Sequence, residues 1–226
     1  MGFGNMVAGA AVDAAAKQAE MKRMLKGRTP EQQSVIKYFY GAGGCLSKGL
    51  TDEQYDQMVQ RTASSMDFKA KALAKIGVDE SEVSEIEPVH FEAYYFTNKN
   101  DNLNKMGNDN KWRSSEYMVT WIFFSDSQIY VYQNTFNMCS GSKKEQTMDY
   151  FYKDVTNFTA VSETYEKDVL DKVSCNGTAS YVHKTVDANE FRLIVPGDKV
   201  VCAMEQTDYT ERAIQGMKAK LREKKA

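Results

Sequence analysis

The spacing of apolar side chains divides the chain into two parts. Up to about residue 77, apolar residues recur every three to four positions, which predicts amphipathic helices. From about Pro88 onward the period falls to two, and β-branched and aromatic residues become frequent, which predicts strands. We therefore expect an α+β protein with a helical accessory region over residues 1–85 and a β domain over residues 86–226. A fragment that begins at Ile86 is expected to fold by itself.

Capping residues mark where the helices start. Segments 29–32 and 51–54 read Thr-Pro-Glu-Gln and Thr-Asp-Glu-Gln, and both are capping boxes that bond the free N–H groups of a first helical turn. Asp67 caps a third helix that ends at Gly77. Residues 6–25 also carry an apolar stripe. This N-terminal helix is expected to pack on the β domain, on a second copy in a homo-oligomer, or on a partner.

About seven strands are predicted in the second half of the chain. They are expected over residues 89–97, 117–124, 128–136, 147–163 with an interruption near 153, 178–186, 190–195 and 200–204. Polar residues 187–189 separate two of these strands, and a loop rich in Asn and Asp extends through Asn110. A final helix, capped by Asp208, turns Ala213, Ile214, Met217 and Leu221 inward.

This order of elements resembles a pleckstrin-homology-like (PH-like) barrel, which has about seven antiparallel strands, a long first connection and one C-terminal helix. Segment 151–158, Phe-Tyr-Lys-Asp-Val-Thr-Asn-Phe, is similar to the aromatic-x-Asp-Ile/Val turn of many bacterial PH-like domains. Segment 49–55 is similar to part of the short helical SHOCT module, which accompanies some of those domains. The resemblance implies a barrel over residues 86–226 whose open end is capped by the C-terminal helix.

Composition excludes several classes of protein. The 226 residues are 42% hydrophobic and 27% charged, which is ordinary for a globular protein. The net charge of −2 provides no positive field for nucleic acid, so we expect no nucleic-acid partner. No apolar run is long enough to span a bilayer, and the N-terminal segment lacks the basic residues of an export signal. We expect a cytoplasmic protein whose four cysteines are reduced.

The sequence contains no pattern of catalytic, metal-binding or cofactor-binding residues. His90 and His183 lack neighbours at ligand spacing, and the glycines of segment 41–49 lack the strand and the Lys-Ser/Thr pair of a phosphate loop. The loop over 98–110 has Leu103 where a calcium loop needs an oxygen ligand. We therefore expect neither an enzyme nor a metal or cofactor site.

One basic pattern remains. Lys99, Lys111 and Arg113 resemble the arrangement by which some PH domains bind phosphorylated head groups between their first two strands. Converging lysine and arginine side chains can chelate an anion, and arginine supplies bidentate hydrogen bonds. The three residues are therefore the candidate anion-binding site.

The sequence favours a non-enzymatic binding or assembly module that recognises a protein or peptide partner. Peptide capture along a sheet edge, or between the barrel and its C-terminal helix, suits this architecture. A membrane-surface adaptor that binds anionic lipid through Lys99, Lys111 and Arg113 is the first alternative. An enzyme whose site is not visible in the sequence is the second.

Overall fold

The computed structural model of the protein describes residues 16–41, 49–97, 102–173 and 179–226. Its N-terminal part is helical over 16–25 and in α2 (Pro30–Phe39), α3 (Asp52–Ser64), α4 (Phe68–Ile76) and the 3-10 turn η1 (Glu80–Val83). Both capping boxes are confirmed, since Thr29 and Thr51 each accept a hydrogen bond from the backbone N–H three residues on. Asp67 caps α4, which ends at Gly77 in the left-handed conformation (φ 80°), where glycine avoids steric strain.

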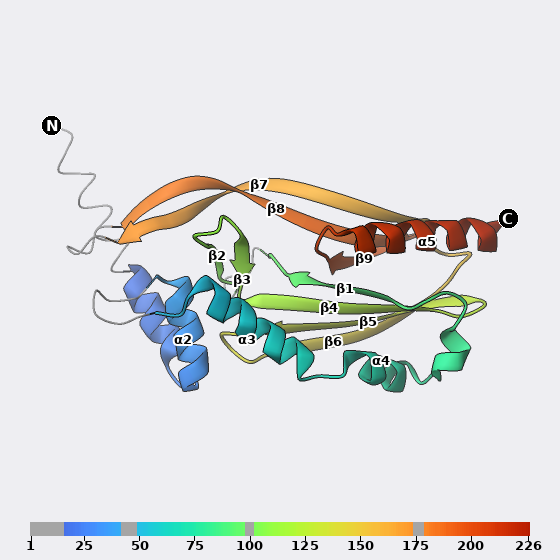
Figure 1. Ribbon diagram of the computed structural model, residues 1–226, viewed down its shortest axis with the longest axis horizontal. Coiled ribbons are helices and arrows are strands. Elements are labelled where there is room, and N and C mark those ends of the chain that lie inside the picture. Colours follow the sequence, from blue (N-terminus) through green and yellow to red (C-terminus); the bar gives the residue numbers. More distant parts are fainter. Residues whose placement is uncertain (1–15, 42–48, 98–101, 174–178) are drawn as a thin grey trace.

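Two antiparallel sheets form most of the second part of the chain (Figure 1). The four-stranded sheet has the order β1 (Val89–Tyr94), β4 (Glu116–Phe124), β5 (Gln128–Asn137) and β6 (Lys143–Phe151). The three-stranded sheet has the order β7 (Asn157–Val173), β8 (Ala179–Val195) and β9 (Asp198–Ala203), and α5 (Asp208–Lys225) follows it. The predicted α+β class is confirmed.

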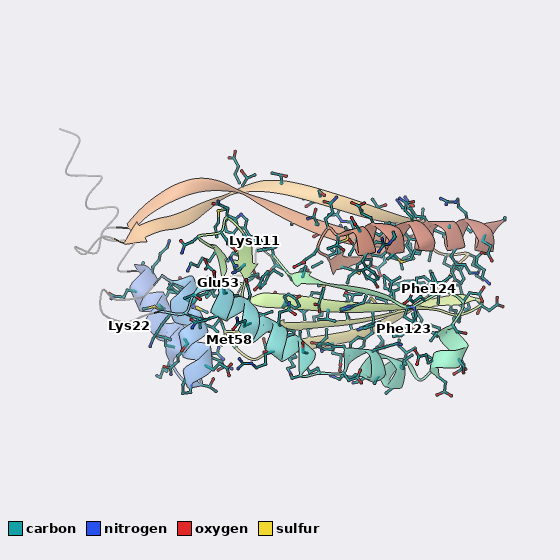
Figure 2. The ribbon with its side chains drawn as sticks, viewed as in Figure 1. Lys22, Glu53, Met58, Lys111, Phe123 and Phe124 are labelled. Carbon is teal, nitrogen blue, oxygen red and sulfur yellow. The ribbon has the colours of Figure 1, made fainter. Side chains whose placement is uncertain are left out.

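Each face of the four-stranded sheet carries an apolar core. One face packs against the three-stranded sheet and α5 in an inner core that includes Phe124 and Phe191. The other face packs against α2, α3 and α4 in an outer core that includes Phe123 and Tyr132. Phe123 and Phe124, labelled in Figure 2, are adjacent on β4 and therefore enter opposite cores. The outer core joins residues from both sides of the predicted boundary at residue 86.

The hairpin β7–β8 is longer than the sequence suggested. Only residues 190–195 of β8 pair with β9, so the rest of the hairpin is a two-stranded ribbon that extends past the hairpin of β2 (Asn104–Met106) and β3 (Trp112–Ser114) (Figure 1). The predicted break at 187–189 was wrong, because β8 stays paired with β7 through these residues. Backbone ladder bonds do not require apolar side chains, so polar residues continue the strand. The indole N–H of Trp112 donates to the carbonyl oxygen of Thr185 at 2.7 Å and ties the ribbon to β3.

The C-terminal helix covers one end of the inner core, as predicted. Ile214, Met217 and Leu221 are 4%, 0% and 7% exposed. The capping residue is Thr207 and not Asp208, since the Thr207 hydroxyl accepts from the N–H of Thr210.

Hydrogen bonding joins the described strands into three separate sheets, because β2 and β3 pair only with each other, and no closed barrel is found. The first connection, predicted to be a loop through Asn110, contains β2. No helix in the described ranges is long and apolar enough to cross a membrane.

Candidate functional site

Of the three predicted anion-binding residues, the structure describes two. Lys99 lies outside the described residues. Lys111, labelled in Figure 2, is exposed, whereas the side chain of Arg113 is only 2% exposed and points into the protein. The structure therefore does not bring Lys111 and Arg113 to one surface, and anion binding by the three residues together stays a prediction.

Two carboxylates neutralise Arg113. Its Nε and Nη2 donate to the two oxygens of Asp56 at 2.7 and 2.6 Å, and Nη1 and Nη2 donate to those of Asp109 at 2.8 Å each. Hydrogen bonds from Arg113 hold the pKa of the Asp109 carboxyl well below its usual range. Burial alone would raise the pKa of Asp56, but hydrogen bonds from Arg113 and Tyr94 outweigh it and lower that pKa.

The same cluster fixes the β2–β3 hairpin to α3. Asp52, one helical turn before Asp56, accepts from the backbone N–H of Asn108 and from the hydroxyl of Tyr38, both at 2.7 Å. A Cβ on Gly107 would lie 2.3 Å from Arg113 Nη1, so any other residue at this position would have to displace the ion-paired guanidinium. Sequence reasoning used Asp52 as part of a capping box and missed this role. The available signal was the spacing of Asp52 and Asp56, which places both on one helical face.

A second polar region lies between the two sheets. Along β5, the residues that face the three-stranded sheet change from apolar to polar: Ile129 and Val131 lie in the inner core, and Gln133, Thr135 and Asn137 follow. The inner core does not extend over this polar half of the β5 face. The polar half lines a hollow of about 560 Å³, here called the mouth groove, whose lining includes Glu116, Gln133, Thr135, Lys144, Gln146 and Lys199.

Hydrogen bonds hold the floor of the mouth groove in place. Gln133 is 4% exposed, and its Nε2 donates to the carbonyl oxygen of Val201 on β9 at 2.7 Å. Gln146 Nε2 donates to Gln133 Oε1, also at 2.7 Å, which fixes the orientation of both amides. The floor therefore offers a rigid set of amide and hydroxyl groups beside the open hollow.

The charges at the mouth groove are only partly compensated. Glu116 accepts a hydrogen bond from Asn102, and Asp198 accepts one from the backbone N–H of Lys199. In contrast, the exposed ammonium groups of Lys144 and Lys199 form no ion pair with any residue that the structure describes. The groove is thus bordered by charges of both signs, with Glu116 and Asp198 beside Lys144 and Lys199.

Histidine and cysteine side chains have ordinary structural surroundings where they are described. His90 stacks on Trp121, with ring centroids 4.7 Å apart. Cys139 and Cys202 are free and buried, and burial raises the pKa of each thiol to about 12. The side chain of His183 and both Cys45 and Cys175 lie outside the described part. Among the described residues, no group of three or more His, Cys, Asp or Glu side chains could hold a metal ion.

The comparisons add no relative. No family model matches the chain, and no curated protein or solved structure matches it.

Proposed function

We propose that the protein is a non-enzymatic recognition module of the PH-like kind, which binds a segment of a protein partner in the mouth groove. The strand order supports this proposal. The resemblance led us to expect about seven antiparallel strands, a long first connection and a final helix. A four-stranded and a three-stranded antiparallel sheet precede the final helix here, and the β2–β3 hairpin lies in the first connection.

The observation that carries the proposal is the uncovered polar half of the four-stranded sheet. A strand face that packs against another sheet is normally apolar, as it is at Ile129 and Val131. Here the same face continues as Gln133, Thr135 and Gln146 and borders a hollow within the size range of ligand sites. Gln133 is bonded to Val201 and Gln146 within the floor, so Thr135 and Gln146 are the groups that can bond the peptide groups of a loop or chain end.

Recognition fits the polar groups better than catalysis does. The carboxyl groups near the sheet whose pKa values are lowered have structural partners: Asp56 and Asp109 are bonded to Arg113, and Glu145 is bonded to Lys71 and Tyr132. Their pKa values are lowered, so they remain anions at neutral pH and accept the hydrogen bonds of these partners. The mouth groove itself is bordered mainly by groups suited to hydrogen bonding.

The test is a peptide-display selection on the full chain, followed by calorimetry of the selected peptides with three proteins. Thr135→Trp places a bulky ring in the mouth groove, whereas Thr147→Trp places the same ring at an exposed position of β6. We expect wild type and Thr147→Trp to bind alike and Thr135→Trp to lose at least tenfold in affinity. Equal binding by Thr135→Trp, or a selection that yields no peptide, would contradict the proposal.

A second candidate is binding of anionic lipid head groups, favoured by the unpaired ammonium groups of Lys144 and Lys199. Such binding attracts the protein to vesicles of phosphatidylglycerol and phosphatidylcholine and weakens as salt screens the charges. We expect Lys144→Ala/Lys199→Ala to remove that binding. A wild-type protein that ignores these vesicles at low ionic strength would leave the peptide proposal alone.

A further inference from the structure

Helix α5 carries two basic stripes with different surroundings. Lys220 and Lys224, four residues apart, are both ion-paired: Lys220 to Glu85 and Glu223, and Lys224 to Glu85 and Asp126. These ion pairs attach α5 to the segment that follows η1 and to the turn between β4 and β5. The charge of this stripe is therefore used within the protein.

The second stripe is uncompensated. Lys218, Arg222 and Lys225 recur at intervals of four and three residues, which places them on one face of α5. None of the three forms an ion pair with a described residue, and Glu223, the acidic residue nearest to them on the helix, is bonded to Lys220. The helix macrodipole favours cations in the last turn of α5, but it does not account for Lys218, which lies two turns from the end.

These three cations border a concave surface. Lys218, Arg222 and Lys225 line a hollow of about 450 Å³. The rest of its lining is buried Leu221, Ala226, Asn157 at the start of β7, and Thr156 just before it. We call this hollow the α5 groove. Figure 1 shows α5 beside β7 at the end of the molecule away from α2. Because β7 is the outer strand of its sheet, a chain in the groove would lie next to a strand edge.

We propose that the α5 groove is a second binding site, separate from the mouth groove, and that it takes an extended acidic segment of a partner protein. Three cations without internal partners match carboxylates at a spacing of a few residues, and Arg222 can bind a carboxylate in bidentate geometry. The volume of the hollow is larger than the volume of one carboxylate or phosphate group. The groove is shallow, and its position beside a strand edge, with cations repeated along one helix face, favours an extended chain.

The experiment measures fluorescence anisotropy of labelled hexaglutamate and hexaglutamine peptides with the full chain. The test variant is Lys218→Ala/Arg222→Ala/Lys225→Ala. The matched control, Lys22→Ala/Lys26→Ala/Arg212→Ala, removes the same charge from three exposed positions outside the groove, with Lys22 at the far end of the molecule (Figure 2). We expect hexaglutamate alone to bind, with an affinity that falls as salt rises. The test variant should bind hexaglutamate at least tenfold more weakly than wild type, and the control variant should bind it less than twofold more weakly.

Three results would overturn the inference. The first is equal binding of hexaglutamate and hexaglutamine, and the second is an equal loss of hexaglutamate affinity in both triple variants. The third is binding to anionic vesicles that requires Lys218, Arg222 and Lys225 in a protein that does not bind hexaglutamate. Unfolding of each variant is followed alongside, and exposed charges should leave the melting temperature nearly unchanged. The variant Thr135→Trp should keep its hexaglutamate affinity, so failure at the mouth groove and failure at the α5 groove give different results.

Discussion

Removing the carboxylates around Arg113 should destabilise the protein more than removing Arg113 itself. In Asp56→Asn/Asp109→Asn, the guanidinium stays buried at 2% exposure without a compensating charge, and each new amide points a donor where an acceptor is needed. Leaving a buried ion unpaired costs about 3–5 kcal/mol. The total stability of a domain is about 5–15 kcal/mol, so this change removes a large share of it.

Arg113→Met has a different cost. The side chains of Asp56 and Asp109 are 39% and 38% exposed, so water can solvate both carboxylates once the guanidinium is gone. Asp56 also keeps its bond from the Tyr94 hydroxyl, and Asp109 its bond from the backbone N–H of Lys111. Methionine fills part of the vacated volume, so we expect a loss of about 1–2 kcal/mol.

Urea unfolding at pH 7, followed by the fluorescence of Trp112 and Trp121, compares the free energies of unfolding. The triple variant that combines the three substitutions should have a free energy of unfolding close to that of Arg113→Met, because it contains no buried guanidinium without a partner. Should the double variant fail to fold while Arg113→Met folds, the predicted order of stabilities is already confirmed. Each single variant, Asp56→Asn or Asp109→Asn, leaves Arg113 one carboxylate partner and should therefore lose less free energy of unfolding than the double variant. A loss in Arg113→Met equal to or larger than that of the double variant would refute the reasoning.

Three further predictions concern stability. Asn134 is 1% exposed in the outer core, and its side chain makes no hydrogen bond of normal geometry with a described residue. Asn134→Leu should therefore raise the free energy of unfolding by about 1–3 kcal/mol. A lower free energy of unfolding would show that the amide is bonded. Hydrogen bonds from Lys71 and Tyr132 lower the pKa of Glu145 to about 2. The ionised Glu145 therefore stabilises the fold fully at pH values above the pKa that the carboxyl has in the unfolded chain. The difference in urea midpoint between wild type and Glu145→Gln should shrink as pH falls from about 5 towards 2. A difference that stays constant over this range would contradict the prediction. Removal of residues 1–85 exposes outer-core side chains whose burial contributes on the order of 10 kcal/mol together: Tyr117, Val119, Phe123, Tyr132 and Phe136. The fragment 86–226 should therefore aggregate or lose cooperative unfolding. A monomeric fragment that unfolds cooperatively would contradict this and confirm the prediction from sequence.

The sequence alone determined the elements that depend on local interactions. Helix starts at Thr29, Thr51 and Asp67 follow from side chains that bond backbone N–H groups within three residues, so no other part of the chain is needed to specify them. The hairpin β4–β5 and the buried face of α5 were predicted correctly for a similar reason. Their apolar periodicity is strong enough to identify the side that must be buried.

Only the tertiary structure decided what the polar residues do. The sequence grouped Arg113 with Lys111, which is two positions away, but the structure pairs the guanidinium with Asp109, four residues earlier, and with Asp56, 57 residues earlier. A continuous β8 through residues 187–189 likewise depends on pairing with β7, which local propensity does not encode.

The layering of the fold was undecided for the same physical reason. Both faces of β4 are apolar in sequence, which predicts a central strand, but it does not tell which elements cover each face. Packing placed α2, α3 and α4 on one face, and the three-stranded sheet with α5 on the other. It also left the polar end of β5 and one basic stripe of α5 uncovered, because burial and charge pairing are properties of contacts between segments far apart in the chain.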